Sequence, residues 1–524
     1  MNSPTDTRPA DTVAADADPA QLIARLRRLG IELWTEEGAL RYRAPAGVFT
    51  DADKQTLKRH RDEVIALLSA QRTLTPAPEQ RFEPFPLTDV QSAYLLGQTD
   101  AFEYGGVSCH GYLEVWLGDV DPEAVQAAWA ELVRRHDMLR AVVDPTTGTQ
   151  RVLPEVPPVR VRRDDSAERV RAELSHARYD AAHWPLHTLC LTPGWLLHIS
   201  VDLLIADFAS VQLLVGELLA LLRGEPLPPI DISFRDYVLA QRALRDGPDY
   251  AEHRDYWLDR LADLPPAPEL PLAADGGGSE SSVRFHRLQR RIPTVRDSAA
   301  AHGVTTSALV LAAYAEAIGR WSRNQRFTIN MPLQNRLALH EQVCALVGDF
   351  TSVNLLEVDL TEPVPLVERA RRLGARLLSD IDHRLYSGVE VLRELGRRAA
   401  SDATDSGRAL MPVVFTGVLG GGTEVRYGIS QTPQVWIDCQ AVEQDDTMLV
   451  SWDVREGVFP DGLAEAAFDM FAALLTGPAD IGPPYPLPAD QERIRQAVND
   501  TRADLPTGLL HEPWLAAARR HGDR

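Results

Sequence analysis

The chain has 524 residues, of which 44% are hydrophobic and 7% aromatic, a composition typical of globular proteins and enough for more than one domain. Its 54 basic and 75 acidic residues give a net charge of −21 without any basic stripe, which argues against general nucleic-acid binding. No apolar run approaches the roughly 20 residues that a membrane-spanning helix needs. The four cysteines, Cys109, Cys190, Cys344 and Cys439, lack metal-ligand spacing and indicate reduced thiols in a cytoplasmic protein.

The first part of the chain divides into three segments by composition. Residues 1–18 are polar and slightly acidic and lack the apolar core of a signal peptide, so we expect a disordered leader. Residues 19–71 have the pattern of a small separate unit. Residues 72–84 are rich in proline and polar side chains, which is typical of a linker.

The small unit is predicted to fold as a helix, a hairpin and a second helix. Its leucines recur at helical spacing until Gly30, and the alternating stretch that follows turns at "EEG". Thr50 and Asp53 then have the spacing of a capping box, which predicts a helix that reaches about Leu68.

Residues 85–482 alternate helical and strand patterns, which predicts a mixed α/β fold. Prolines and then glycines at 264–280 divide this region into an expected N-terminal lobe, residues 85–265, and a C-terminal lobe, residues 266–482. Residues 483–524 begin with prolines and then start a new amphipathic segment. The clearest predicted strands are residues 195–205, 326–333, 353–360, 411–419, 433–442 and 447–454, and the clearest helices are residues 121–139 and 305–321.

The stretch "DLLIADFAS" places two carboxylates in an apolar run, where an unpaired charge is costly. Asp207 stands at the N-cap position of a helix that ends at Gly224, with Ser210 at N3. Asp202 ends a buried strand, and we expect it to pair with an arginine because a buried carboxylate needs such a partner. The pattern alone therefore favours structural roles for both aspartates.

His198 lies four residues before Asp202, and this spacing resembles part of the HHxxxDG motif of chloramphenicol-acetyltransferase-type acyltransferases, in which a histidine is the base. A better registration sets Asp202 at the first histidine of that motif and Asp207 at its aspartate. Leu203 then stands where the active histidine belongs, and a leucine cannot take a proton. A protein of that fold with this sequence must use different chemistry.

The same stretch matches the DxxxxDxxS motif of heterocyclization domains of nonribosomal peptide synthetases, which are variants of condensation domains. The resemblance continues over residues 82–475, where further motifs follow in the order of that family. They are "FPLTDVQSAYLLGQ", "RHDMLRAV", "GDFTS", "MPVVFTGVLG", "ISQTPQVWIDCQ" and "WDVREGVFPDGL". The chain is therefore similar to this family along most of its length.

The resemblance implies a fold and a set of partners. The fold is a V-shaped pseudo-dimer of two chloramphenicol-acetyltransferase-like lobes with a central tunnel, preceded by a small α/β docking domain. The family holds no metal or organic cofactor. Its substrates arrive on the phosphopantetheine arms of upstream and downstream peptidyl carrier proteins.

The resemblance also implies two reactions. The amine of a carrier-bound Cys, Ser or Thr attacks an upstream acyl thioester and forms an amide. The side-chain thiol or hydroxyl then attacks that amide, and loss of water gives a thiazoline or oxazoline. The second reaction needs a group that protonates the departing oxygen and removes the nitrogen proton.

In the family, that work is attributed to a threonine and an aspartate, which match Thr416 and Asp438 here. Alternation in "VWID" sets Asp438 on the face opposite Ile437, so we expect it to point into the tunnel with Thr416 as a hydrogen-bond donor. Without the flanking motifs, both would be interpreted as ordinary strand residues.

The remaining motif residues are expected to shape the tunnel. Asp202, Asp207 and Ser210 are assigned mainly architectural roles, and Arg336 is a candidate partner for one of the aspartates. Gln431 is a candidate tunnel-lining residue, with a polar loop residue as the alternative interpretation.

Residues 19–71 resemble docking domains that bind a C-terminal segment of the preceding synthetase subunit. The hairpin offers an edge for strand addition, and Lys54, Lys58, Arg59 and Arg61 either attract an acidic tail or form a solvated helix face. The tail after about residue 490 resembles the link into an adenylation domain, so we expect such a domain to follow.

Three alternative functions remain open from the sequence. A plain condensation domain would form the amide without cyclizing it. A non-catalytic platform that recruits carrier proteins would keep the fold but is expected to lose Thr416 and Asp438. A free-standing acyltransferase would use His198 as its base. The sequence does not decide whether Cys, Ser or Thr is cyclized, nor does it identify the acyl donor.

Overall fold

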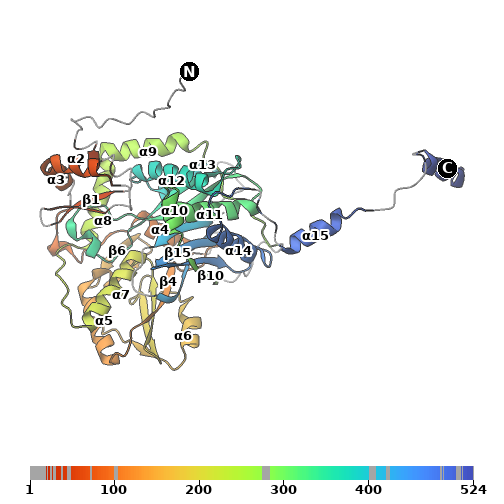
Figure 1. The fold of residues 1–524 in the computed structure, drawn as a ribbon. Helices are drawn as coiled ribbons and strands as arrows, with labels where there is room; N and C mark the ends of the chain where they lie inside the picture. The colour runs from red at the N-terminus through yellow and green to blue at the C-terminus, as the bar shows by residue number, and fades with distance from the viewer. Residues whose placement is uncertain are drawn as a thin grey trace, which may run out of the picture. The chain divides into compact units, whose positions relative to one another are not determined.

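The computed structural model describes residues 31–36, 39–43, 49–70, 74–99, 104–273, 284–399, 409–419, 425–483, 489–502 and 511–522, with single positions between 19 and 26 and between 485 and 509. The leader expected at residues 1–18 lies outside these residues. The chain divides into two compact units, residues 1–481 and 482–524, and Figure 1 shows the helices and strands of both.

The N-terminal part contains the predicted hairpin. Strand β1 (Glu32–Glu36) pairs antiparallel with β2 (Ala39–Arg43), and the helices α2 (Asp51–Arg59) and α3 (Arg61–Ala70) follow. The apolar side chains of the segment gather in one small core, which holds Leu22, Ile23, Leu26, Ile31, Leu33, Phe49, Leu57 and Val64. Burial of these side chains stabilises the unit because it removes apolar surface from water.

The helix that follows the hairpin begins as predicted and ends early. The side chain of Thr50 accepts from the backbone N–H of Asp53, and the Asp53 carboxylate accepts in return from the N–H of Thr50, which completes the capping box. The single helix expected to reach Leu68 is wrong, because the chain leaves the helical conformation at His60. No glycine or proline marks that break in the sequence.

The first large sheet has five strands in the order β14-β4-β9-β8-β7. Helices α5 (Pro122–Arg135) and α7 (Phe208–Leu222) bury their apolar stripes against one face of it. The strands are β4 (His110–Trp116), β7 (Arg162–Arg163), β8 (His187–Thr192), β9 (Leu196–Asp202) and β14 (Val425–Gln431).

The second large sheet has six strands in the order β10-β16-β15-β13-β11-β12. Helices α11 (Thr306–Trp321) and α14 (Leu463–Thr476) pack against its apolar face. The strands are β10 (Phe285–Pro293), β11 (Arg326–Gln334), β12 (Thr351–Asp359), β13 (Val413–Leu419), β15 (Ile437–Gln444) and β16 (Thr447–Arg455).

Shorter elements complete the fold. Strands β3 (Phe85–Pro86), β5 (Ala141–Asp144) and β6 (Thr149–Val152) form a small third sheet. The remaining helices of residues 74–481 are α4 (Asp89–Gly97), α6 (Ala167–Leu174), α8 (Phe234–Ala243), α9 (Pro248–Arg260), α10 (Arg296–Ala301), α12 (Leu366–Asp382) and α13 (Gly388–Ala399). The 3₁₀ turns are η1 (Pro78–Gln80), η2 (Asp137–Arg140), η3 (Leu244–Asp246) and η4 (Glu341–Ala345). The C-terminal unit contains α15 (Ala489–Asn499) and α16 (Glu512–Arg520).

Strict alternation gives the six-stranded sheet one apolar face and one polar face. On β15, Ile437 and Cys439 join the core under α11 and α14, whereas Asp438 and Gln440 point to the other side. The same alternation recurs on the neighbouring strands, so this face collects side chains from all six strands. This face positions the candidate site.

A strand from the second half of the chain completes the sheet of the first half. β14 pairs antiparallel with β4, with Ser430 opposite Gly111 and Gln431 opposite His110. The sequence-based division into residues 85–265 and 266–482 does not anticipate this crossing. In the described part of the chain, no helix is both long enough and apolar enough to cross a bilayer.

Candidate active site

A cavity of about 700 Å³ lies between the two large sheets. The six strands β10, β11, β12, β13, β15 and β16 line one side, and residues of β4, β9, β14, α4 and α7 line the other. Several apolar side chains from α4 and α13 narrow it further. The cavity therefore has the mixed apolar and polar lining that is typical of a ligand site.

Thr416 and Asp438 meet on the polar face of the six-stranded sheet. Strands β13 and β15 run parallel, and a bulge between Phe415 and Gly417 shifts their register at Thr416. Gly417 has a φ of 102°, which other residues rarely adopt, so the bulge depends on glycine. The Thr416 hydroxyl donates to Oδ1 of Asp438 at 2.7 Å. The expected hydrogen bond is present, and both side chains line the cavity.

Two carboxylates face each other across adjacent strands in this site. Asp438 of β15 lies directly opposite Asp453 of β16, and Arg287 of β10 lies opposite Asp453 on its other side. Like charges at opposed positions destabilise a sheet unless a counter-charge is present. Arg287 supplies it with two hydrogen bonds to Asp453, Nε to Oδ1 at 2.7 Å and Nη2 to Oδ2 at 2.6 Å.

Asp438 is almost fully buried, at 9% exposure, and has two polar neighbours besides Thr416. The amide of Gln440 donates to its Oδ2 at 2.7 Å, and the hydroxyl of Ser430 lies 3.4 Å from the same oxygen. Burial raises the pKa of Asp438, and the charge of Asp453 raises it further, while the hydrogen bonds from Thr416 and Gln440 oppose part of that rise. A carboxyl group with a raised pKa can both donate and accept a proton near neutral pH.

Asp207 and Ser210 form the expected helix cap and are held by Arg336. Oδ1 of Asp207 accepts from the backbone N–H of Ser210 at 2.7 Å and from Nη2 of Arg336 at 3.1 Å. Arg336 also donates to the Ser210 hydroxyl at 2.9 Å, and that hydroxyl bonds the carbonyl of Gly348 at 2.8 Å. The candidate partner Arg336 is thus paired with Asp207. These contacts fasten α7 to the loop before β12, which agrees with an architectural role.

The expectation that Asp202 pairs with an arginine is wrong. Its Oδ1 accepts from the backbone N–H of Leu204 at 2.9 Å, and within the described residues Oδ2 has no hydrogen-bond partner. Asp202 is fully buried, and burial raises its pKa to about 7. The site avoids the cost of a buried charge because the carboxyl group can take a proton instead. Asp202 does not line the cavity.

Gln431 is the last residue of β14 and is buried rather than exposed in a loop. Its amide donates to the carbonyl of Ser108 at 3.3 Å, and its oxygen lies 3.2 Å from Nδ1 of His176. Gln431 is not among the residues that line the cavity, although Ser430 and Thr432 on either side are. Neither of the two sequence-based interpretations of Gln431 describes this position.

His198 is sealed inside the first sheet. Its ring nitrogens contact the hydroxyl of Tyr112 at 2.6 Å and that of Thr192 at 2.9 Å. Burial lowers its pKa, even though Glu114 lies 3.7 Å away. His198 does not reach the cavity, so the structure gives no support to an acyltransferase that uses it as a base.

Three polar residues of the cavity were not singled out from the sequence. Arg287 and Gln440 lie beside Asp438, and Asn330 of β11 presents an amide oxygen that has no partner among the described residues. Gln440 is the last residue of the motif "ISQTPQVWIDCQ", whereas the sequence signal of Arg287 and Asn330 is alternation alone, since each stands on the same face of its strand as other lining residues. Asn330 could hydrogen-bond a substrate through that free oxygen.

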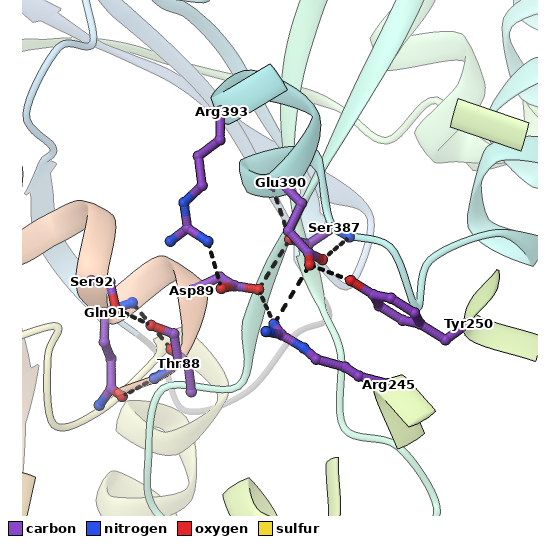
Figure 2. A network of polar contacts seen from close by, with 9 residues as sticks. All are labelled: Thr88, Asp89, Gln91, Ser92, Arg245, Tyr250, Ser387, Glu390 and Arg393. Atoms are coloured by element: carbon purple, nitrogen blue, oxygen red, sulfur yellow. Dashed lines mark hydrogen bonds and ion pairs between the residues drawn. The ribbon is translucent and has the colours of Figure 1, made fainter. Parts of the chain in front are cut away.

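A second polar network joins α4 to α13 (Figure 2). Asp89, the first residue of α4, accepts from Nη2 of Arg245 at 2.5 Å and from Nη1 of Arg393 at 3.0 Å. Glu390 of α13 accepts from the Tyr250 hydroxyl in the same network. Arg393 also lines the cavity, so these contacts hold two elements of the cavity wall together.

Comparison of the sequence with models of known families shows to which family the chain belongs. The model of the condensation domain matches residues 85–408, which include α4, the Asp202–Asp207 motif, four strands of the five-stranded sheet and three strands of the six-stranded sheet. The chain belongs to the condensation-domain family. The model of the TubC N-terminal docking domain matches residues 20–70, so a docking domain precedes the condensation domain.

Curated relatives of this condensation domain are larger synthetases. Pyochelin synthetase PchF of Pseudomonas aeruginosa is 41% identical over 491 residues, which cover 87% of this chain and 26% of the relative. Phenyloxazoline synthase MbtB of Mycolicibacterium paratuberculosis is 38% identical over 485 residues, which cover 85% of this chain and 41% of the relative. The chain thus spans only about a quarter to two fifths of these relatives.

Among solved structures, the condensation domain and its docking domain resemble the cyclization-docking bidomain of EpoB from Sorangium cellulosum. The TM-score is 0.73 at 31% identity, and the match covers 87% of this chain and 97% of the other. The chain is therefore a cyclization-type condensation domain with an N-terminal docking domain. Carrier proteins and other synthetase components are the partners that such domains imply.

Proposed function

We propose that this domain joins a carrier-bound acyl group to a carrier-bound Cys, Ser or Thr and then cyclizes the amide to a thiazoline or oxazoline. The observation that supports it most is the Thr416–Asp438 hydrogen bond in a cavity between the two sheets. The names of the relatives agree with this chemistry, since one is a phenyloxazoline synthase and the solved bidomain is a cyclization domain.

The first reaction transfers the acyl group. The acceptor amine attacks the thioester carbonyl, the carbon–nitrogen bond forms, and the donor thiol leaves with the proton that the amine loses. Leu203 lines the cavity where the histidine base of related acyltransferases would stand. The cavity contributes mainly by holding the two carrier-bound groups together, which lowers the entropy cost of their reaction.

The second reaction removes one water. The side-chain sulfur or oxygen bonds to the amide carbon and loses its proton, and the carbonyl oxygen becomes a hydroxyl group. Asp438 in its protonated form gives its proton to that hydroxyl, which leaves as water. The resulting carboxylate then takes the proton from nitrogen as the carbon–nitrogen double bond forms, so Asp438 ends protonated again.

Thr416 supports this cycle by fixing the carboxyl group. Its hydroxyl donates to Oδ1 of Asp438, and Gln440 donates to Oδ2, so the group cannot rotate freely. A proton on a fixed oxygen is aimed at one point in the cavity, which is what general acid catalysis requires.

The partners of this reaction are also proposed. Phosphopantetheine arms of an upstream and a downstream peptidyl carrier protein deliver the two substrates, and this domain supplies no cofactor of its own. Residues 19–71 receive the C-terminal tail of a preceding subunit, and the residues after about 490 lead into an adenylation domain. The greater length of the matched synthetases supports a multidomain setting.

Intact-protein mass spectrometry tests the proposal. A donor carrier loaded with an acetyl or benzoyl group is mixed with acceptor carriers loaded with Cys, Ser or Thr, and the chain is added. The expected product is an amide that has lost one further water with at least one acceptor. If every acceptor stops at the open amide, the chain is a plain condensation domain, and if no amide forms, it is a non-catalytic platform.

The variants Asp438→Asn and Thr416→Ala test whether these two residues act in the cyclization step. Asp438→Asn should slow cyclization by about a hundredfold or more and let the open amide accumulate, because the proton donor is gone. Thr416→Ala should have the same effect to a smaller degree. Asp446→Asn, in the exposed turn between β15 and β16, is the matched control and should cyclize normally. Equal loss of amide formation and cyclization in Asp438→Asn would contradict the assignment.

A further inference from the structure

Three neighbouring strands carry a row of charged side chains, namely Arg287, Asp453 and Asp438. The proposed reaction does not explain why Asp438, and not Asp453, carries the proton. Two opposed carboxylates share one side of a buried sheet, and one arginine is bonded to only one of them. Asp453 has a fully buried side chain, whereas Asp438 faces the cavity. Such a pair cannot hold two full charges without cost, so the surroundings decide which of them takes a proton.

The contacts of Arg287 distinguish the two carboxylates. Its guanidinium forms a two-pronged contact with both oxygens of Asp453, and the side chain is itself about 90% buried. The backbone N–H of Ser430 donates to Asp453 as well, at 2.9 Å. All three of these hydrogen bonds go to Asp453, whereas Asp438 receives no cation of its own within hydrogen-bonding distance in the described residues.

Arg287 also determines the orientation of Gln440. Its Nη2 donates to Oε1 of Gln440 at 3.1 Å, and a guanidinium can only donate. The amide oxygen must therefore face Arg287, and the amide NH₂ must face Oδ2 of Asp438, at 2.7 Å, and the Ser430 hydroxyl, at 2.8 Å. Gln440 thus occupies Oδ2 of Asp438 with a donor.

Other titratable groups near Asp438 are few in the described residues. Tyr427 of β14 lies on the cavity side near Arg287 and Asp453. Cys439 and Tyr314 of α11 lie on the apolar face, and burial raises the pKa of both. Arg287 and Asp453 are therefore the charges that face Asp438.

We propose that Arg287 and Gln440 are positioning residues for cyclization. Arg287 confines the negative charge of the carboxylate pair to Asp453 and turns the Gln440 amide toward Asp438. Asp438 is then the group whose proton is exchanged, and that proton lies on the cavity side. This inference rests on the proposed function, because it assigns no role outside the cyclization step.

The test measures cyclization against pH in the full chain and its variants, with the acetyl donor and the acceptor carrier that the wild type cyclizes. Wild-type cyclization should fall on the alkaline side, where Asp438 loses its proton. Asp453→Asn removes the neighbouring negative charge and should move that alkaline limb to lower pH. Arg287→Met leaves the pair uncompensated and should move it to higher pH, in each case by about one pH unit.

Three further variants separate positioning from folding. Arg287→Lys keeps the cation, so the alkaline limb of its pH profile should lie close to that of the wild type. It loses the contact with Gln440 and should therefore still cyclize more slowly. Gln440→Leu should slow cyclization by about tenfold while open-amide formation stays within about twofold. Arg290→Met removes an exposed cation of the same strand, bonded to Asp469, and should behave as wild type.

The outcomes are distinct. Opposite shifts of the alkaline limb in Asp453→Asn and Arg287→Met support the inference, because a merely structural loss would not move the limb in two directions. Unmoved limbs, shifts in the same direction, or equal loss of amide formation and cyclization overturn it. If Arg287→Met does not fold by circular dichroism, Arg287→Lys and Asp453→Asn still decide. A wild type that never cyclizes defeats the proposed function instead.

Discussion

At the scale of single residues, the two aspartates of one motif, Asp202 and Asp207, are both buried, and each avoids the cost of an unpaired buried charge in a different way. Asp207 keeps its charge partner, since it caps α7 and is paired with Arg336 at 3.1 Å. Asp202, five positions earlier, has no cationic partner among the residues that the structure describes, and its buried carboxyl group is tolerated because it can hold a proton. The same residue type is therefore held by an arginine in one case and by a single backbone hydrogen bond in the other.

The variant Asp202→Asn should differ from the wild type in how its free energy of unfolding depends on pH. Because burial raises the pKa of Asp202 from 3.8 to about 7, the wild type loses stability as pH rises toward 7, whereas asparagine has no proton to lose. Between pH 5 and 8, the free energy of unfolding of the wild type should fall by roughly 3 kcal/mol relative to the variant. Urea denaturation at both pH values measures it, with exposed Asp119→Asn as the control. A difference that does not change with pH would contradict it.

Much of the candidate site could be predicted from the sequence, and the exceptions have a physical cause. Asp438 and Thr416 stand in motifs, and alternation on a strand fixes the face on which each lies. Arg287 and Asp453 are 166 positions apart and meet only because β10 and β16 are neighbours. Sequence periodicity reports the face of a strand, but it does not report which strand lies beside it.

At the scale of elements, the start of α4 joins two parts of the cavity wall (Figure 2). Thr88 and Gln91 form a capping box at its N-terminus, and Asp89 beside them contacts Arg245 and Arg393. A carboxylate in the first turn also suits the helix dipole. The capping-box pattern is typical of a helix start, but the contact to α13 comes from a residue 304 positions away.

Asp89→Asn should loosen that connection. The variant keeps the size of the side chain but removes the carboxylate that Arg245 and Arg393 share, while Arg245 keeps its longer contact with Glu390 at 3.8 Å. The free energy of unfolding should fall by about 1 kcal/mol, because both arginines are partly exposed to solvent. Because Arg393 and Ser92 line the cavity, the KM for the carrier-bound substrates should rise while the ratio of cyclized to open product stays constant. Thermal denaturation and steady-state kinetics test both, against Asp165→Asn on an exposed loop. A changed product ratio with an unchanged KM would contradict this assignment.

At the scale of the whole molecule, the alternation of helical and strand patterns predicts the mixed α/β fold correctly. The hairpin and the strands that were predicted from the sequence are present close to the predicted residues. The crossing of β14 into the first sheet could not be predicted, because none of the predicted strands includes residues 425–431 and periodicity does not report which sheet a strand joins. β14 covers the edge of β4, and an uncovered edge is prone to aggregation.

Dividing the chain within residues 274–283 should therefore fail to give two independent domains. Fragment 1–273 should aggregate when expressed alone, because β4 has lost its neighbour, and coexpression with fragment 284–524 should restore a soluble complex. Size-exclusion chromatography and circular dichroism distinguish the cases. A monomeric fragment 1–273 with a cooperative thermal transition would show that the sheet does not need β14.

The crossing of β14 also bears on the engineering of hybrid synthetases. A chimera that joins the first half of one parent to the second half of another places β4 and β14 from different parents in one sheet, where six residue pairs must match. Ser430 of β14 also bonds Asp453 beside Asp438, so a mismatch would reach the proposed chemistry. A recombination that respects the fold has two further junctions, and it transfers residues 425–431 together with the first half.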